Sequence, residues 1–139
     1  MAGPPLRPRW AATAGVAVVA FGAVTVVVGG KTLFGTPAER AAAGNIVPFV
    51  LWFNFIAGFA YMAAGVGMVL WTRWAGVLSA SIAAATMGVF IALGVYIALG
   101  GPFEARTVAA MTFRSFVWIG LAIWLSRAGI FRPFASQRR

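Results

Sequence analysis

The chain has 139 residues, of which 62% are hydrophobic and 9% are charged, and its formal net charge is +9. Soluble domains contain about a quarter charged residues, so this composition excludes a soluble globular domain. Cysteine and histidine are both absent, which excludes disulfides, Cys/His zinc sites, His-ligated haem and general-base catalysis by histidine. We therefore expect no metal site and no cofactor.

Four apolar runs approach or exceed the length needed to cross about 30 Å of hydrocarbon, namely 10–29, 46–71, 74–99 and 107–126. They predict an all-α integral membrane protein, a four-helix bundle that forms a single membrane domain over residues 1–139. No polar segment is long enough to bury a core of its own. A cleaved signal peptide is the alternative for the first run, but a retained helix is favoured because the run is about twenty residues long.

The segment after the first run has the sequence pattern of a helix start. We expect the first span to end at Gly29–Gly30. In the following TPAERAA, Thr36 is the expected N-cap, Pro37 the first helical residue and Glu39 part of the first turn. These residues predict a short interfacial helix between the first two spans.

Lys and Arg are distributed unevenly between the two ends of the predicted bundle. With the N-terminus in the cytoplasm, seven of them lie inside and three outside, and Arg114 lies within a span. This bias supports two cytoplasmic termini with short basic tails, in a bacterial-type inner membrane. The positive charge is explained by this topology, and no basic stripe with interleaved aromatics lies outside the spans, so we expect no nucleic-acid partner. A tryptophan belt at the cytoplasmic interface agrees with this orientation: Trp10, Trp71, Trp74 and Trp124.

The third span carries a small side chain at every fourth position. Such spacing lines one helix face where a neighbouring backbone can approach closely. Ordinary packing inside the bundle is favoured over a dedicated dimer seam. The stripe consists of Gly76, Ala80, Ala84, Gly88 and Ala92.

Two strongly polar side chains lie inside the spans, on the outer side of mid-membrane. Arg114 is eight residues from Arg106, about 12 Å along a helix axis. Arg114 could snorkel to the outer interface, or it could face the interior and bind a carboxylate, a phosphate or a quinone-like carbonyl. Asn54 could form a structural interhelical hydrogen bond, or it could face Arg114 across one polar pocket.

Four charged residues are expected to ring the outer mouth of that pocket. These residues are Lys31, Glu39, Glu104 and Arg106. For Glu104 and Arg106, a solvated loop pair is the alternative.

No Asp or Glu lies within any span. Proton- or sodium-coupled cation transporters usually need a membrane carboxylate, and small multidrug-resistance exporters rely on a glutamate in the first helix, so both classes are excluded. Fluoride-type channels assemble with dual topology, which conflicts with the charge bias, and they stay a minor alternative. We expect no enzymatic activity, because no base lies at a plausible spacing from Ser79, Ser81, Ser115, Tyr61 or Tyr96.

Three stretches precede or begin a long Ala/Gly-rich third helix: VVVGGKTLFG (26–35), FIAGFAYMAAGVGMVL (55–70) and TRWAG (72–76). Together they resemble the DoxX-like superfamily of small four-helix membrane proteins. The acid found in the second helix of many such proteins is replaced here by a neutral stretch around Asn54. The resemblance implies an accessory membrane subunit, in some cases beside quinone- or sulfur-linked redox enzymes.

These observations favour a non-catalytic accessory or structural subunit of a larger membrane complex, with a redox or energy-transducing complex as one candidate. Its expected partners are the lipid bilayer, other membrane subunits or a second copy of itself, and a quinone or an anionic headgroup. The alternative is a small channel or carrier for an anion or small solute, with Arg114 and Asn54 in its path. A stand-alone lipid-packing protein is a third hypothesis.

Overall fold

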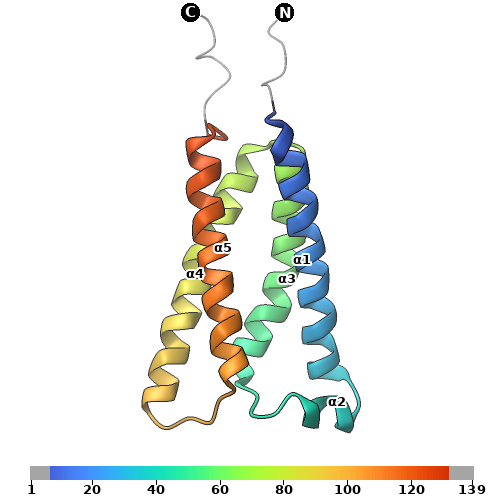
Figure 1. Ribbon diagram of the computed structural model, residues 1–139, viewed down its shortest axis with the longest axis vertical. Helices are drawn as coiled ribbons and strands as arrows, with labels where there is room; N and C mark the ends of the chain where they lie inside the picture. Colours follow the sequence, from blue (N-terminus) through green and yellow to red (C-terminus); the bar gives the residue numbers. More distant parts are fainter. Residues whose placement is uncertain (1–6, 132–139) are drawn as a thin grey trace, which may run out of the picture.

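The computed structural model describes residues 7–131, which form five helices and no strands. Four long helices run side by side: α1 (Arg9–Phe34), α3 (Pro48–Val69), α4 (Arg73–Ala98) and α5 (Ala105–Arg127) (Figure 1). Each is long and apolar enough to cross a membrane. The predicted all-helical class is confirmed, and the four helices indicate a multi-pass membrane protein.

The molecule has two distinct ends. Helix α1 begins and α5 ends at the terminus end, whereas the short α2 (Pro37–Ala42) and the α4–α5 loop lie at the opposite end, the α2 end (Figure 1). The boundaries of the last three long helices differ from the predicted ones by one or two residues.

The predicted end of the first span at Gly29–Gly30 is wrong, because α1 continues to Phe34. Gly29 is buried, and a Cβ atom placed on it would lie 3.3 Å from the Cβ of Phe55 on α3. The helix stops only at Gly35, whose N–H donates to the carbonyl of Lys31 at 2.9 Å. Gly29 therefore serves as a contact with α3 and not as a helix stop.

The predicted short helix at TPAERAA is confirmed as α2, and its start is a complete capping box. The backbone N–H of Thr36 donates to Glu39 Oε2 at 2.8 Å, and the N–H of Glu39 donates to Thr36 Oγ1 at 3.3 Å. No residue of α2 is buried. Local capping, and not core packing, therefore specifies this helix.

Helices α1 and α3 form the most closely packed pair, through glycines spaced seven residues apart on both helices. A Cβ atom on Gly15 would lie 2.6 Å from the carbonyl oxygen of Gly65, and one on Gly22 would lie 2.7 Å from that of Gly58. A seven-residue step rotates by only about 20° around a helix, so these glycines stay on the contact face. Small residues at such a face let two membrane helices meet backbone to backbone.

The predicted packing of the small-residue stripe of α4 inside the bundle is wrong, because only its first member, Gly76, is buried. A four-residue step advances by about 40° around a helix, so the stripe turns away from the interior along α4. The buried face follows seven-residue steps instead, with Ser79 and Thr86 as an example. The other four members of the stripe are exposed: Ala80, Ala84, Gly88 and Ala92.

Helices α1 and α5 face each other without backbone contact, since no Cα atoms of these two described helices lie within 8 Å. Aromatic side chains bridge this α1–α5 seam instead. Near the terminus end, Trp10 stacks on Trp124 with ring centroids 3.8 Å apart. Farther along, Phe21 meets Phe113 edge to face at 6.0 Å. The seam is therefore closed by rings over the part nearer the terminus end.

Candidate functional site: a cationic cavity at the α2 end

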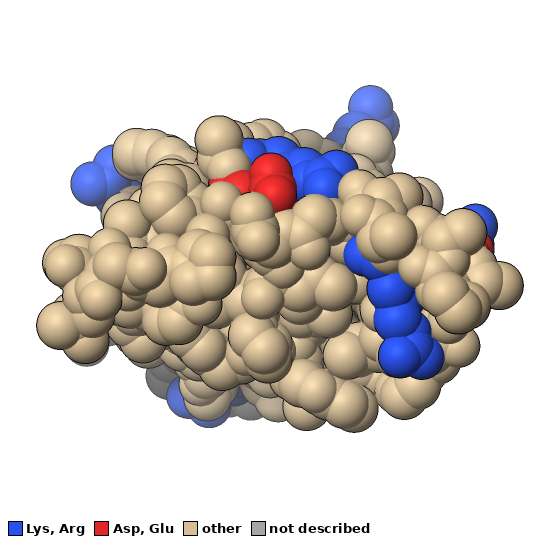
Figure 2. All heavy atoms as spheres, turned by 90° about the horizontal axis from the view of Figure 1, so that it is seen from below, with Lys and Arg blue, Asp and Glu red and all other residues tan. Residues whose placement is uncertain are grey.

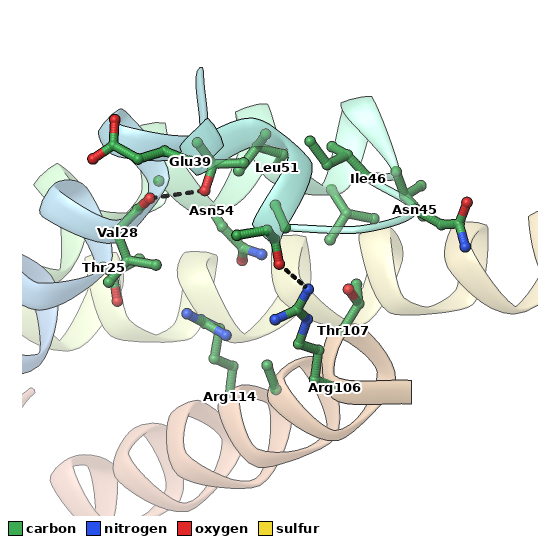
Figure 3. A pocket seen from close by; sticks show the side chains of 17 residues that line it. Thr25, Val28, Glu39, Asn45, Ile46, Leu51, Asn54, Arg106, Thr107 and Arg114 are labelled. Carbon is green, nitrogen blue, oxygen red and sulfur yellow. Dashed lines mark hydrogen bonds between the residues drawn. The ribbon is translucent and has the colours of Figure 1, made fainter. Parts of the chain in front are cut away.

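A cavity of about 490 Å³ lies at the α2 end, between α1, α2, α3 and α5. Both polar residues predicted for the spans line it, Asn54 from α3 and Arg114 from α5. Figure 3 shows the side chains of Arg114 and Arg106 extending from α5 toward the side of the cavity that carries Asn54. The structure thus brings Asn54 and Arg114 to one cavity.

The Arg114 side chain points into the protein interior and is half-buried. Its guanidinium carbon lies 5.6 Å from the centroid of the Phe21 ring, within the range of a cation–π interaction. Its Nε atom is buried and has no hydrogen-bond partner among the described residues. The Phe21 ring supports the flat guanidinium group of Arg114, and Arg114 lines the cavity with its N–H donors.

Tyr61 lies next to Arg114 and was not expected to belong to the site. It is fully buried, stacks on Phe21 at 5.6 Å and packs against Trp118 at 4.7 Å. Its hydroxyl lies near Arg114, Thr86 and Trp118 but meets none of them in hydrogen-bonding geometry. The sequence signal was its position seven residues after Asn54, which places both on one face of α3.

Neither acidic residue of the chain neutralises Arg114, because both carboxylates are bound elsewhere. Glu39 lines the cavity but caps α2. Hydrogen bonds from the Thr36 backbone and hydroxyl, helped by the charge of Lys31, lower the pKa of Glu39 below its ordinary value. Glu104 accepts from the backbone N–H of Asn45 at 2.8 Å. The charge of Arg114 therefore has no carboxylate partner.

The four residues predicted for the mouth divide into two groups. Glu39 and Arg106 line the cavity, whereas Lys31 and Glu104 are not among its lining residues. Figure 2, which looks onto the α2 end, shows a few basic side chains set in a mainly uncharged surface.

Glu104 and Arg106 both bind the α2–α3 connection and thereby join it to the start of α5. These bonds differ from the solvated pair between Glu104 and Arg106 that is expected as the alternative. Arg106 Nη2 donates to the carbonyl of Ala42, the last residue of α2, at 2.9 Å. Glu104 lies so close to Gly44 that a Cβ atom there would be 2.4 Å from its Oε1. Gly44 also has a φ of +72°, so only glycine fits this connection without strain.

The lining determines which ligands the cavity can bind. Two arginines and the amides of Asn45 and Asn54 supply donors, while the valines, Ile46 and Leu51 supply apolar walls. Within residues 7–131 no group of three or more Asp, Glu, His or Cys side chains could hold a metal ion. The cavity therefore has the chemistry of a binding site for an anion with an apolar part.

Comparisons of the chain with protein-family models, curated proteins and solved structures found no match, so the resemblance to the DoxX-like superfamily stays a prediction.

Proposed function

We propose that this protein binds an anionic solute in the cavity at the α2 end, as a small membrane carrier or binding protein. Arg114 is the group that recognises the anion, and Asn54 and Arg106 assist it. The single observation that carries this proposal is the charge of Arg114, which points into the interior without a carboxylate partner.

The cost of burying an arginine supports a ligand at this position. Arg114 lies nine residues into α5, about 13 Å along the helix axis. A charge at the bilayer centre costs about 2.5–3.5 kcal/mol on insertion scales, and less at smaller depth. A buried charge of this kind is normally paired, and a guanidinium group pairs best with a carboxylate or a phosphate.

The size and lining of the cavity indicate an organic anion. Cavities of about 300–1,000 Å³ hold small organic molecules, and about 490 Å³ falls within this range. Apolar walls from Val28, Val50 and Leu51 would contact the non-polar part of such a ligand.

We further propose a four-helix bundle in a bacterial-type inner membrane, with both termini in the cytoplasm and the cavity on the outer side. Basic residues are more numerous at the terminus end, as the positive-inside rule requires for a cytoplasmic face. Because the chain lacks cysteine, single-cysteine variants report the topology directly. Ala41→Cys should react with an impermeant maleimide on intact cells, and Ala128→Cys only after permeabilisation. The reverse pattern would refute this orientation.

The experiment that tests anion binding is a titration of the protein in nanodiscs with octanoate, with the uncharged 1-octanol as comparison. Octanoate should bind and 1-octanol should bind at least tenfold more weakly, since charge-assisted hydrogen bonds contribute about 1.5–3 kcal/mol. Arg114→Gln should remove this preference.

Arg127→Gln is the matched control, because Arg127 is an exposed arginine of the same helix at the terminus end. It should leave octanoate binding unchanged. Equal binding of octanoate to the wild type and to Arg114→Gln would refute the proposal.

A second candidate function is the accessory subunit of a larger membrane complex. The exposed small-residue face of α4 favours it, because a partner helix could approach closely there. Purification from native membranes in mild detergent should then yield a partner in fixed stoichiometry. Ala84→Leu should release that partner, and Val77→Leu, at an exposed position outside the stripe, should retain it.

A further inference from the structure

We infer that the ligand of the cavity is a membrane-borne anionic amphiphile, which enters sideways from the bilayer through the α1–α5 seam. Its anionic group reaches Arg114, and its hydrocarbon chain leaves between α1 and α5. This inference rests on the proposed function and adds the ligand class and the route of entry.

The side chains along the α1–α5 seam change in size from one end to the other. Large rings close it nearer the terminus end, where Trp10 stacks on Trp124 and Phe21 meets Phe113. The cavity begins beyond these rings. Apart from Val28 and the two arginines, the walls that α1 and α5 contribute there carry small or hydroxyl side chains, namely Thr25, Gly29, Thr32, Thr107 and Ala110.

No backbone contact closes this part of the seam. The Cα atoms of α1 and α5 stay more than 8 Å apart over the described length of both helices. Val28 is 59% exposed and also lines the cavity, so the cavity reaches the outer surface of α1 at this residue. In a membrane, that surface faces hydrocarbon and not water.

The charges and apolar surfaces match an amphiphile that approaches from this side. Arg114 places a positive charge within the apolar span, about 13 Å along the axis of α5, where an anion that binds it gives up part of its hydration. An amphiphile keeps its chain in lipid while its anionic group enters the cavity. The exposed apolar side chains beside the opening, Val24 on α1 and Phe113 on α5, would contact that chain.

The experiment compares stearate with butyrate for binding to the protein in nanodiscs. Stearate should bind at least a hundredfold more tightly, because only stearate partitions into the bilayer. Val28→Trp, which fills the lateral opening, should weaken stearate binding at least tenfold. Val27→Trp is the matched control, since Val27 is 56% exposed but does not line the cavity, and it should leave stearate binding unchanged.

A spin label on the ligand provides a second measurement that does not depend on a variant. A nitroxide on carbon 5 of stearate should broaden the methyl signals of Val24 and Val28 on α1 more than that of Ile91 on the exposed face of α4.

The outcomes separate this inference from the proposed function. Butyrate bound as tightly as stearate, with Arg114→Gln abolishing both, would leave anion binding intact and overturn the membrane route. Unchanged stearate binding by Val28→Trp, or equal broadening on α1 and α4, would also overturn that route. The absence of Arg114-dependent binding of any carboxylate would refute the proposed function itself.

Discussion

The α1–α3 interface and the outer face of α4 are both rich in glycine and alanine, yet they have opposite environments. Cβ atoms on Gly15 and Gly22 would meet backbone carbonyls of α3 at 2.6 and 2.7 Å, whereas a Cβ atom on Gly88 would have no neighbour within 4 Å. The difference lies in the spacing. Seven-residue steps keep a residue on one helix face, and four-residue steps move it around the helix. Small residues alone therefore do not identify a helix interface in this chain.

The largest expected effect comes from filling the closest contact between α1 and α3. Gly22→Val should lower the free energy of unfolding by about 2–3 kcal/mol, because the added atoms meet the backbone of α3, which cannot move aside. Gly88→Ala should have the opposite effect and raise the free energy of unfolding by about 0.5–1 kcal/mol, since alanine favours a helix and its Cβ meets open space. Unfolding in mixed micelles by added dodecyl sulfate measures both. Similar effects at the two positions would contradict the comparison.

A second prediction concerns Arg114, which faces the loosely packed α1–α5 seam. Arg114→Leu should raise the free energy of unfolding of the ligand-free protein by about 1–3 kcal/mol, because replacing an unpaired buried charge by an apolar side chain removes its desolvation cost. The same micelle titration measures this change. Arg127→Leu, at an exposed position, should change stability by less than about 0.5 kcal/mol. A destabilised Arg114→Leu protein would mean that the charge has a partner within the fold.

A smaller effect is expected on the outer face of α4. Ala84→Leu should change the free energy of unfolding of the isolated chain by less than about 0.5 kcal/mol, because Ala84 is exposed and outside the contacts of this chain. The buried Ala83, one residue away, is the matched control, and Ala83→Leu should be clearly destabilising. Equal destabilisation by the two variants would show that the stripe packs within the chain after all.

The smallest effect concerns the capping box of α2. The folded-state pKa of Glu39 is lowered, so its contribution to the stability of α2 is present above the unfolded-state pKa and is lost as the pH falls through the folded-state pKa. The protection factors of the α2 amides, which compare their exchange rates with those of the unfolded chain at the same pH, should therefore fall on acidification, while those of α3 stay high. In Glu39→Gln, which does not titrate, the protection factors of α2 should lose this pH dependence. Retention of the pH dependence would exclude Glu39 as its source.

The positions of the helices were predictable from hydropathy, whereas their rotations were not. Span length and capping residues predict α2 and the bounds of α3, α4 and α5 to within two residues, whereas they place the end of α1 several residues before Phe34. The depths of Asn54 and Arg114 followed from counting along the spans. That both line one cavity depends on how α3 and α5 rotate against their neighbours, and a single span contains no information on this rotation.

The sequence contains a signal for the α1–α3 interface. Gly15, Gly22 and Gly29 repeat every seven residues, as do Gly58 and Gly65, and this shared spacing indicates that α1 meets α3. The four-residue stripe of α4 predicts packing inside the bundle, but its members after Gly76 are exposed. The Gly29–Gly30 pair resembles a helix end because glycine often follows helices, whereas within α1 Gly29 permits close packing against Phe55.

The stacked pair Trp10–Trp124 has a mechanical consequence for the whole molecule. It fastens α1 directly to α5 near the terminus end. At the α2 end, α5 is held instead to the α2–α3 connection, by the hydrogen bonds of Glu104 and Arg106 and by the packing of Met111 with Val47 and Val50. The α1–α5 pair should therefore be stiffest at the terminus end and most flexible at the α2 end. We expect α5 to pivot at the tryptophan pair, so that the α1–α5 seam widens most where the cavity lies. Helices α1 and α3 should move together as one rigid unit.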